Sequence, residues 1–363
     1  MDKNFETNEK NSGLTKGFES CQPRLELEGY YIYYGHGKIL LSGEYFVLDG
    51  AQGLALPTFP GQRLRVRYSP SYDPCLTWKS YDEQGEIWFE GKFEFWKFAC
   101  KQANLPDVGK KIQQILKQVR RQNPHFLRDG VDVLVETFLD FPRDWGLGSS
   151  STLLYNIAQW AYIGPFELSS QTFGGSGYDI ACAGSEGPIL FQKTSKGPAW
   201  SPVTFWPSFH SNLFFVHQGK KAETAKAIEL YKELKLNKEK YIDRITKISN
   251  DMLQAKTLEE FEALMYAHEE IVSRAIDSPP VKLAYFSDYQ GEIKSLGAWG
   301  GDFLLVSSRD CEYSRQYFKE KGLEVFIPFE KMILKRPVQN LAANLKSSSE
   351  ELEKSSNTNY LIQ

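Results

Sequence analysis

The sequence lacks the cysteine patterns by which disulfide-stabilised domains and zinc sites are recognised. Its five cysteines are odd in number and scattered singly, with no Cys-x-x-Cys pair among them: Cys21, Cys75, Cys100, Cys182 and Cys311. Neither a disulfide framework nor a cysteine-ligated zinc is therefore expected. The five histidines also show no metal-ligand spacing. Unpaired cysteines are typical of a reducing compartment, so we expect a cytoplasmic protein.

Long apolar runs and an excess of one charge are also missing. No run of about 18 apolar residues is available to span a membrane, and the polar residues 1–20 lack the apolar core of a signal peptide. The 43 Lys and Arg residues nearly balance the 46 Asp and Glu residues, which gives a formal net charge of -3. Because no basic field attracts polyanions, we expect neither nucleic acid nor a membrane as a partner.

The sequence does have enough apolar material for two domains, with 41% hydrophobic and 14% aromatic residues in a chain of 363. The polar segments 1–24 and 337–363 are expected to be flexible tails. Between them, the pattern of strands and helices changes near residue 208. We therefore predict an N-terminal domain over residues 25–208 and a C-terminal domain over residues 209–336.

Both predicted domains mix strands and helices, so the expected fold class is α+β. An apolar stripe on a basic segment predicts a helix over residues 107–123, through Val108, Ile112, Ile115, Leu116 and Val119. Branched and aromatic runs predict strands in the first domain at 30–34, 38–42, 54–59, 62–68, 86–96, 131–138, 188–193 and 202–206. In the second domain we expect strands at 212–218, 302–308 and 323–327 and helices at 223–234, between 238 and 277, and around 314–321.

The stretch DWGLGSSSTLLYNIAQW, residues 144–160, has the composition of a phosphate-binding loop. Gly146 and Gly148 lack β-carbons and allow the backbone to turn with positive φ and approach a ligand closely. Ser149, Ser150 and Ser151 then begin a helix whose first amides have no internal partner and favour an anion. The stretch is not a Walker A loop, because no Lys-[Ser/Thr] closes it. The alternative is a glycine turn with serine caps that simply begins a core helix.

Two further stretches favour the phosphate-binding alternative. Lys38 lies in a glycine-flanked turn of GHGKILLSGEYFVLDG, and Asp179 lies in the glycine-rich FGGSGYDIACAGSEG. Taken singly, the lysine is a surface charge by default and the aspartate a helix cap. Beside a phosphate cradle, an ammonium and a carboxylate are what phosphoryl transfer to an alcohol requires.

In these stretches the chain resembles the GHMP kinase superfamily, in particular its mevalonate kinase and phosphomevalonate kinase branch. GKILLSGEYFVLDG is similar to the first motif of that family, GLGSSST to the second and GAWGGD, residues 297–302, to the third. The resemblance implies the two-domain GHMP kinase fold, with an N-terminal domain like the second domain of ribosomal protein S5 and a ferredoxin-like C-terminal domain. It also implies ATP and Mg²⁺ as cofactors and an active site between the domains.

The resemblance assigns roles residue by residue. Asp179 matches the catalytic aspartate, and Lys38 matches the lysine that keeps it ionised and offsets charge on the γ-phosphoryl group. The β- and γ-phosphates would be held by the second motif: Gly146, Leu147, Gly148, Ser149, Ser150 and Ser151. Ser150 would reach Mg²⁺, which prefers hard oxygen ligands.

The carboxylate ligand of Mg²⁺ and the third motif depart from the family pattern. Glu167 is the acid nearest before Asp179, but the segment that carries it is short, so a surface or capping role stays open. Glu44 is a second candidate that could instead be structural. Trp299 replaces a glycine, and we expect it to alter substrate specificity. The remaining third-motif residues agree with the family: Gly297, Gly300, Gly301 and Asp302.

The expected function is that of an ATP- and Mg²⁺-dependent kinase of a small alcohol or its phosphate, with mevalonate or phosphomevalonate of isoprenoid biosynthesis as the acceptor. Galactokinase is disfavoured, because no counterpart of its sugar-binding signature occurs. Two alternatives stay open, a diphosphomevalonate decarboxylase and a non-catalytic nucleotide-binding pseudokinase. The expected partner is a small-molecule substrate, and the chain is expected to be a monomer or a homodimer.

Overall fold

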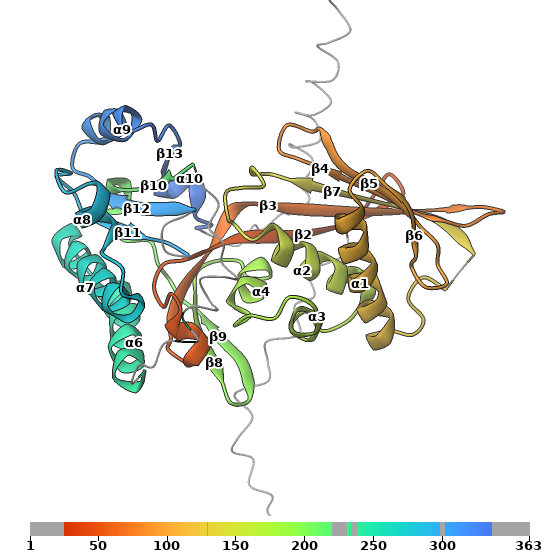
Figure 1. Ribbon diagram of the computed structural model, residues 1–363, viewed down its shortest axis with the longest axis horizontal. Coiled ribbons are helices and arrows are strands. Elements are labelled where there is room, and N and C mark those ends of the chain that lie inside the picture. The colour runs from red at the N-terminus through yellow and green to blue at the C-terminus, as the bar shows by residue number, and fades with distance from the viewer. Residues whose placement is uncertain are drawn as a thin grey trace, which may run out of the picture.

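The computed structural model describes residues 25–128, 130–219, 231, 233, 238–297 and 302–335. The two predicted tails, most of the predicted helix at 223–234, and Trp299, Gly300 and Gly301 lie outside these residues. Two sheets and their helices occupy opposite ends of the molecule in Figure 1, so the α+β class predicted from the sequence is confirmed. None of the described helices combines the length and the apolar character that crossing a membrane requires.

The larger sheet contains nine strands within the described residues, in the order β1-β2-β3-β7-β4-β5-β6, with β8 beside β3 and β9 beside β8. β4 and β7 run parallel, and the other neighbours run antiparallel. The strands are β1 (Leu25–Leu27), β2 (Tyr30–Leu40), β3 (Gly53–Pro70), β4 (Leu76–Tyr81), β5 (Ile87–Phe93), β6 (Cys100–Ala103), β7 (Val131–Leu139), β8 (Ile189–Thr194) and β9 (Gly197–Pro202).

β2 and β3 form the long antiparallel pair that carries the first motif into the site. The two runs predicted at 54–59 and 62–68 are one continuous strand of 18 residues. The register between β2 and β3 shifts between His36 and Lys38, which marks a β-bulge. A bulge re-aims the side chains that follow it, so the irregularity falls where Lys38 enters the candidate site.

Four helices cover one face of the larger sheet (Figure 1): α1 (Pro106–Gln122), α2 (Ser149–Ala161), α3 (Pro165–Thr172) and α4 (Tyr178–Ala183). α1 confirms the helix predicted from its apolar stripe, because Ile112, Ile115, Leu116 and Val119 are all buried. They pack with alternate residues of the central strands, such as Leu64, Val66, Val133 and Val135. The period of 3.6 on the helix and the period of two on the strands thus meet in one core.

The smaller sheet has the order β11-β12-β10-β13, and its four described strands are antiparallel. The strands are β10 (Leu213–His217), β11 (Ile293–Ser295), β12 (Phe303–Ser307) and β13 (Phe326–Pro328). The described helices of this part are α6 (Glu239–Gln254), α7 (Leu258–Ile276), α8 (Val281–Tyr285), α9 (Cys311–Glu320) and α10 (Phe329–Met332). The helices predicted between residues 238 and 277 are therefore confirmed as α6 and α7.

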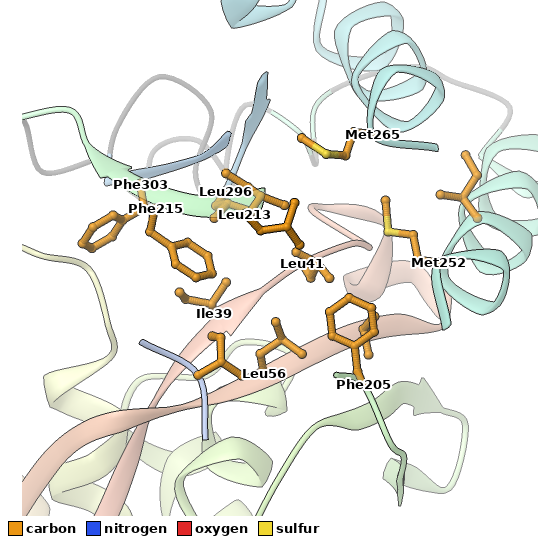
Figure 2. Packing of buried hydrophobic residues seen from close by; sticks show 14 of the residues in the cluster. Ile39, Leu41, Leu56, Phe205, Leu213, Phe215, Met252, Met265, Leu296 and Phe303 are labelled. Atoms are coloured by element: carbon orange, nitrogen blue, oxygen red, sulfur yellow. The ribbon is translucent and has the colours of Figure 1, made fainter. Parts of the chain in front are cut away.

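One apolar core joins the two sheets. Figure 2 shows Ile39 and Leu56 of the larger sheet, and Leu41 just after β2, facing Leu213, Phe215 and Phe303 of the smaller sheet. Met252 of α6 and Met265 of α7 extend the same buried cluster. Because the first motif continues directly into this shared core, its residues are fixed relative to the smaller sheet as well as the larger.

The prediction of a strand at 202–206 is wrong. β8 instead pairs with β9, which ends at Pro202, because the turn between Thr194 and Gly197 closes a tight hairpin. Phe205 lies beyond that hairpin and is buried in the core shared by the sheets. Its apolar character therefore reflects core packing and not strand pairing. The predicted domain boundary near residue 208 falls between β9 and β10 and stays a prediction.

Candidate active site

The glycine loop after β7 leads directly into α2. Gly146 and Gly148 have φ angles of 67° and 91°, in the region that favours glycine. Gly148 is the N-cap of α2, and no side chain caps the helix there. The amides of Ser151 and Thr152 donate to the Gly148 carbonyl (3.0 Å each). The amides of Ser149 and Ser150 precede these bonds, and no side chain caps them at the positive end of the dipole of this 13-residue helix.

Polar side chains under α2 hold this helix on the sheet. The hydroxyl of Thr152 donates to the side-chain oxygen of Gln62 (2.7 Å), and the amide of Asn156 donates to the Gln62 carbonyl (2.8 Å). All three side chains are buried. Since buried polar groups without partners are costly, these bonds specify where the N-terminus of α2 lies relative to β3.

Lys38 lies against the glycine loop. Its backbone N–H donates to the Leu147 carbonyl (2.9 Å), and its half-buried side chain passes so close to Gly148 that a β-carbon there would lie 3.1 Å from Cγ of Lys38. Burial lowers the pKa of the Lys38 ammonium, but Tyr178, Asp302 and Asp179 raise it, and the net pKa is above its usual value. Lys38 is therefore a fixed positive charge beside the loop.

Asp179 completes the arrangement from α4. The hydroxyl of Ser151 donates to Oδ2 of Asp179, and the Ile180 amide lies 3.0 Å from Oδ1. The structure thus brings together Lys38, the glycine loop and Asp179, as the sequence predicts. It differs in one respect, because the Ser151 hydroxyl is buried and directed at Asp179, whereas that of Ser150 is exposed.

Asp302 brings the third motif to the same loop. It is buried, its φ is 56°, and its carboxylate lies directly over Gly146. A pocket between the two sheets is lined by residues of β2, the glycine loop and the third motif, among them Lys38, Trp145, Leu147, Gly297, Asp302 and Phe303. Gly297 also has a positive φ of 73°. The described part of the third motif therefore closes the pocket from the side of the smaller sheet.

Glu44 lies away from this arrangement. It is buried, its Oε1 contacts Nζ of Lys294 on β11, and its Oε2 lies 3.0 Å from Nε2 of His268 on α7. Burial raises the pKa of the Glu44 carboxyl. Lys294 and His268 lower this pKa by a larger amount, so the net pKa is below its usual value. These contacts give Glu44 a structural part in joining the two sheets.

Glu167 is exposed on α3, where it accepts a hydrogen bond from Gln171 (3.0 Å). None of the contacts within the described ranges joins it to Asp179 or Ser150. Its assignment as a Mg²⁺ ligand stays a prediction without support from this geometry.

Four residues were not singled out from the sequence, one in the site and three around Glu44. The first is Tyr178, which immediately precedes Asp179 and contacts Lys38. The others are Lys294, His268 and Glu269, which surround Glu44. Lys294 lies three positions before Gly297, in a segment for which no strand was predicted, so its burial had no local signal in the sequence.

The residues of this site suit the binding of a nucleoside triphosphate. Two positive-φ glycines, the uncapped amides at the start of α2 and the Lys38 ammonium bring backbone donors and positive charge together here. Over the described residues, no group of three His, Cys, Asp or Glu side chains is placed to hold a metal by itself.

No protein-family model matches the sequence, and no curated protein matches it either. Solved structures do match. The L. major mevalonate kinase in complex with R-mevalonate has a TM-score of 0.58 at 17% identity, over 83% of this chain and 94% of that one. The Methanococcus jannaschii mevalonate kinase has a TM-score of 0.60 at 16% identity, over 82% and 96%.

The Streptococcus pneumoniae phosphomevalonate kinase in complex with phosphomevalonate and AMPPNP matches with a TM-score of 0.56 at 18% identity, over 81% of this chain and 98% of that one. The Lactococcus lactis galactokinase complexed with galactose is similar as well, with a TM-score of 0.60 at 13% identity, over 85% and 94%. These likenesses confirm the two-domain fold expected from the sequence.

Proposed function

We propose that this chain, which has the fold of the GHMP kinases, is an ATP- and Mg²⁺-dependent kinase that phosphorylates a small alcohol or its phosphate. The observation that carries the proposal is the convergence of Lys38, the loop of Gly146 to Gly148, and Asp179. These groups come from β2, the start of α2 and α4, which lie far apart in the sequence. A core helix with a glycine turn would need neither the ammonium nor the carboxylate at that place.

In the proposed reaction, Asp179 orients the acceptor hydroxyl and accepts its proton. The Ser151 hydroxyl and the Ile180 amide fix the two carboxylate oxygens, so the aspartate is held in one orientation. A positioned base of this kind contributes typically 10²- to 10⁴-fold to a rate. Ser151 would then act through Asp179, while the exposed Ser150 hydroxyl faces the phosphates.

Lys38 supplies the positive charge of the site. Its side chain passes over Gly148, so its ammonium would offset negative charge that develops on the transferred phosphoryl group. The uncapped amides of α2 bind the phosphate oxygens. When bound, Mg²⁺ supplies further neutralisation of phosphate charge, with the Ser150 hydroxyl as its proposed protein ligand.

We further propose mevalonate or phosphomevalonate as the acceptor. The support is the similarity of GEYFVLDG and GSGYDIACA to that branch and the fold shared with enzymes that bind those two compounds. The described cysteines are all unpaired, which suits the proposed cytoplasmic location: Cys75, Cys100, Cys182 and Cys311.

The experiment is ADP release from Mg·ATP with a panel of acceptors: mevalonate, phosphomevalonate, diphosphomevalonate, homoserine and galactose. We expect turnover with mevalonate or phosphomevalonate and no release of carbon dioxide. Carbon dioxide release with diphosphomevalonate would identify the decarboxylase instead. ATP binding without turnover on any acceptor would contradict the proposed kinase and favour a nucleotide-binding regulator.

A further inference from the structure

An ion pair lies inside the apolar core that joins the two sheets. Nζ of Lys294 on β11 lies 2.5 Å from Oε1 of Glu44, and it also donates to the Ser295 carbonyl (2.9 Å). The side chain of Lys294 is fully buried and that of Glu44 is 2% exposed. Because removing two charges from water is costly, apolar residues of similar size often fill such a place equally well. Unlike an apolar contact, however, a bond between an ammonium and a carboxylate fixes the distance and direction between the atoms it joins.

Glu44 belongs to the segment that carries Lys38 into the site. β2 holds Lys38, and the chain beyond this strand reaches Glu44 through Gly43. The Gly43 amide donates to Nε2 of His268 on α7 (3.1 Å), so this short link is held as well. At its other end, the Lys38 amide donates to the Leu147 carbonyl (2.9 Å). A shift of Glu44 is therefore transmitted to the contact between β2 and the glycine loop.

Lys294 belongs to the segment that carries the third motif. β11 leads directly into Leu296 and Gly297, which line the pocket. The Leu296 amide donates to the Phe303 carbonyl (3.1 Å). A β-carbon at Gly297 would lie 3.4 Å from Oδ2 of Asp302, whose carboxylate covers the glycine loop. A shift of Lys294 is therefore transmitted to the same loop from the side of the smaller sheet.

The pair thus joins two walls of one pocket. β2 lines the pocket on the side of Glu44, and the third motif lines it on the side of Lys294. We propose that Glu44 and Lys294 are positioning residues, whose ion pair holds the third motif and Lys38 in fixed places on either side of the glycine loop. The part of the pair in catalysis rests on the proposed kinase function, whereas its effect on the pocket does not. A pair that served stability alone could be replaced by apolar residues without any change in the pocket.

The test uses Glu44→Met combined with Lys294→Met, which fills the same space with flexible apolar side chains but lacks the ion pair. The matched control replaces the exposed pair of Lys247 and Asp251 on α6 by methionines. Glu44→Gln, which keeps the shape of the side chain and an acceptor for Lys294, is the second variant and keeps the test decisive where the double variant does not fold. Circular dichroism and urea unfolding identify the folded variants.

Hydrogen exchange measures how firmly the walls of the pocket are held. The informative amides are those of Lys38 and Leu296, whose acceptors are the carbonyls of Leu147 and Phe303. The amides of α1, which lies far from the smaller sheet in Figure 1, serve as the internal reference. We expect the Lys38 and Leu296 amides to exchange about tenfold faster in the double variant and about threefold faster in Glu44→Gln, as loss or weakening of one charged hydrogen bond implies. Exchange in α1 and in the control should not change.

Calorimetric titration with Mg·ATP adds a functional readout. We expect the dissociation constant to rise about tenfold in the double variant and to stay unchanged in the control. Unchanged exchange at Lys38 and Leu296 in the folded variants would overturn the inference, whatever the activity. Faster exchange with unchanged nucleotide affinity and turnover would overturn it as well, because the loosened walls would then not affect the site. Faster exchange in a chain that neither binds Mg·ATP nor phosphorylates an acceptor would leave the effect on the pocket standing and contradict the kinase function instead.

Discussion

The carboxylate of Asp302 lies directly over Cα of Gly146, so that the third motif supports the loop of the second. A β-carbon added at Gly146 would lie 2.2 Å from Cγ of Asp302, and 2.4 and 2.5 Å from its two oxygens. Non-bonded atoms cannot approach so closely, and the carboxylate belongs to a buried residue. The glycine at position 146 is therefore required by this neighbour as well as by its own backbone conformation.

Gly146→Ala should consequently lose nucleotide binding and stability. The left-handed φ of 67° alone costs an alanine about 1–2 kcal/mol, and displacement of Asp302 adds to that. The double variant with Asp302→Gly should recover part of the loss, because it removes the colliding side chain and suits the φ of 56° at position 302. Urea unfolding and calorimetric titration with Mg·ATP measure both effects. A Gly146→Ala protein as stable as the unchanged chain would contradict the close contact.

Lys294→Met should be strongly destabilising, because it leaves Glu44 buried without its main counter-charge. Breaking a buried pair from one side costs about 3–5 kcal/mol, whereas replacing both partners by apolar groups is often nearly neutral. We therefore expect Lys294→Met combined with Glu44→Met to be more stable than Lys294→Met alone. The exposed pair of Lys247 and Asp251 supplies the control, since Lys247→Met should cost only about 0.3–0.5 kcal/mol. Equal losses for Lys294→Met and Lys247→Met in urea unfolding would argue against this role of Lys294.

Glu269 predicts how stability depends on pH. Burial, offset in part by Lys294 and reinforced by Glu44, raises the pKa of this carboxyl to about 8. Hydrogen bonding to Ser295 of β11 also acts to lower it. Because the folded chain keeps a proton that the unfolded chain has lost, this contribution to stability is complete below the ordinary glutamate pKa of about 4.3 and is lost as pH rises toward 8.

Glu269→Gln should remove this dependence, since an amide does not titrate. Urea unfolding of both chains from pH 5 to pH 9 measures the difference. We expect the free energy of unfolding of the unchanged chain to fall relative to that of Glu269→Gln by about 1 kcal/mol per pH unit up to pH 8. Above pH 8 the difference should level off. A difference in the free energy of unfolding that stays constant over this range would mean that Glu269 is ionised in the folded chain throughout.

Replacing Ser150 and replacing Ser151 should change different kinetic quantities. Ser151→Ala removes the hydroxyl that orients Asp179, so we expect kcat to fall about tenfold with little change in ATP affinity. Ser150→Ala should chiefly weaken the binding of Mg·ATP, because the exposed Ser150 hydroxyl is the proposed magnesium ligand. Steady-state kinetics with varied Mg²⁺ distinguish the two. The reverse pattern would exchange the roles of the serines.

Short sequence patterns predicted the helices and strands that depend mainly on residues close together in the chain. The stripe on α1 follows from side-chain period and the strand β7 from its run of branched and aromatic residues, and both elements were confirmed. The glycine loop, Lys38 and Asp179 could be singled out because each lies in a short stretch of sequence whose glycines or charges indicate a site. That they meet in space was implied by the family resemblance and is seen in the structure.

The parts that could not be predicted depend on contacts between distant segments. Lys294 and Glu44 are separated by 250 positions in the chain, and nothing local to either indicates the other. Ser151 and Asp179 are 28 positions apart, so the direction of the Ser151 hydroxyl became known only with α4 in place. The same holds for Phe205, whose apolar neighbours suggested a strand, although it fills the core between the sheets.

The measurement that tests the central claim most directly is phosphoryl transfer by Asp179→Asn beside the unchanged chain, with calorimetric titration of Mg·ATP on both. The account predicts that turnover with the preferred acceptor falls by roughly 10² or more, as loss of a positioned base does, while nucleotide affinity stays nearly the same. Near-normal turnover in the variant would contradict the assignment of Asp179 and, with it, the proposed mechanism.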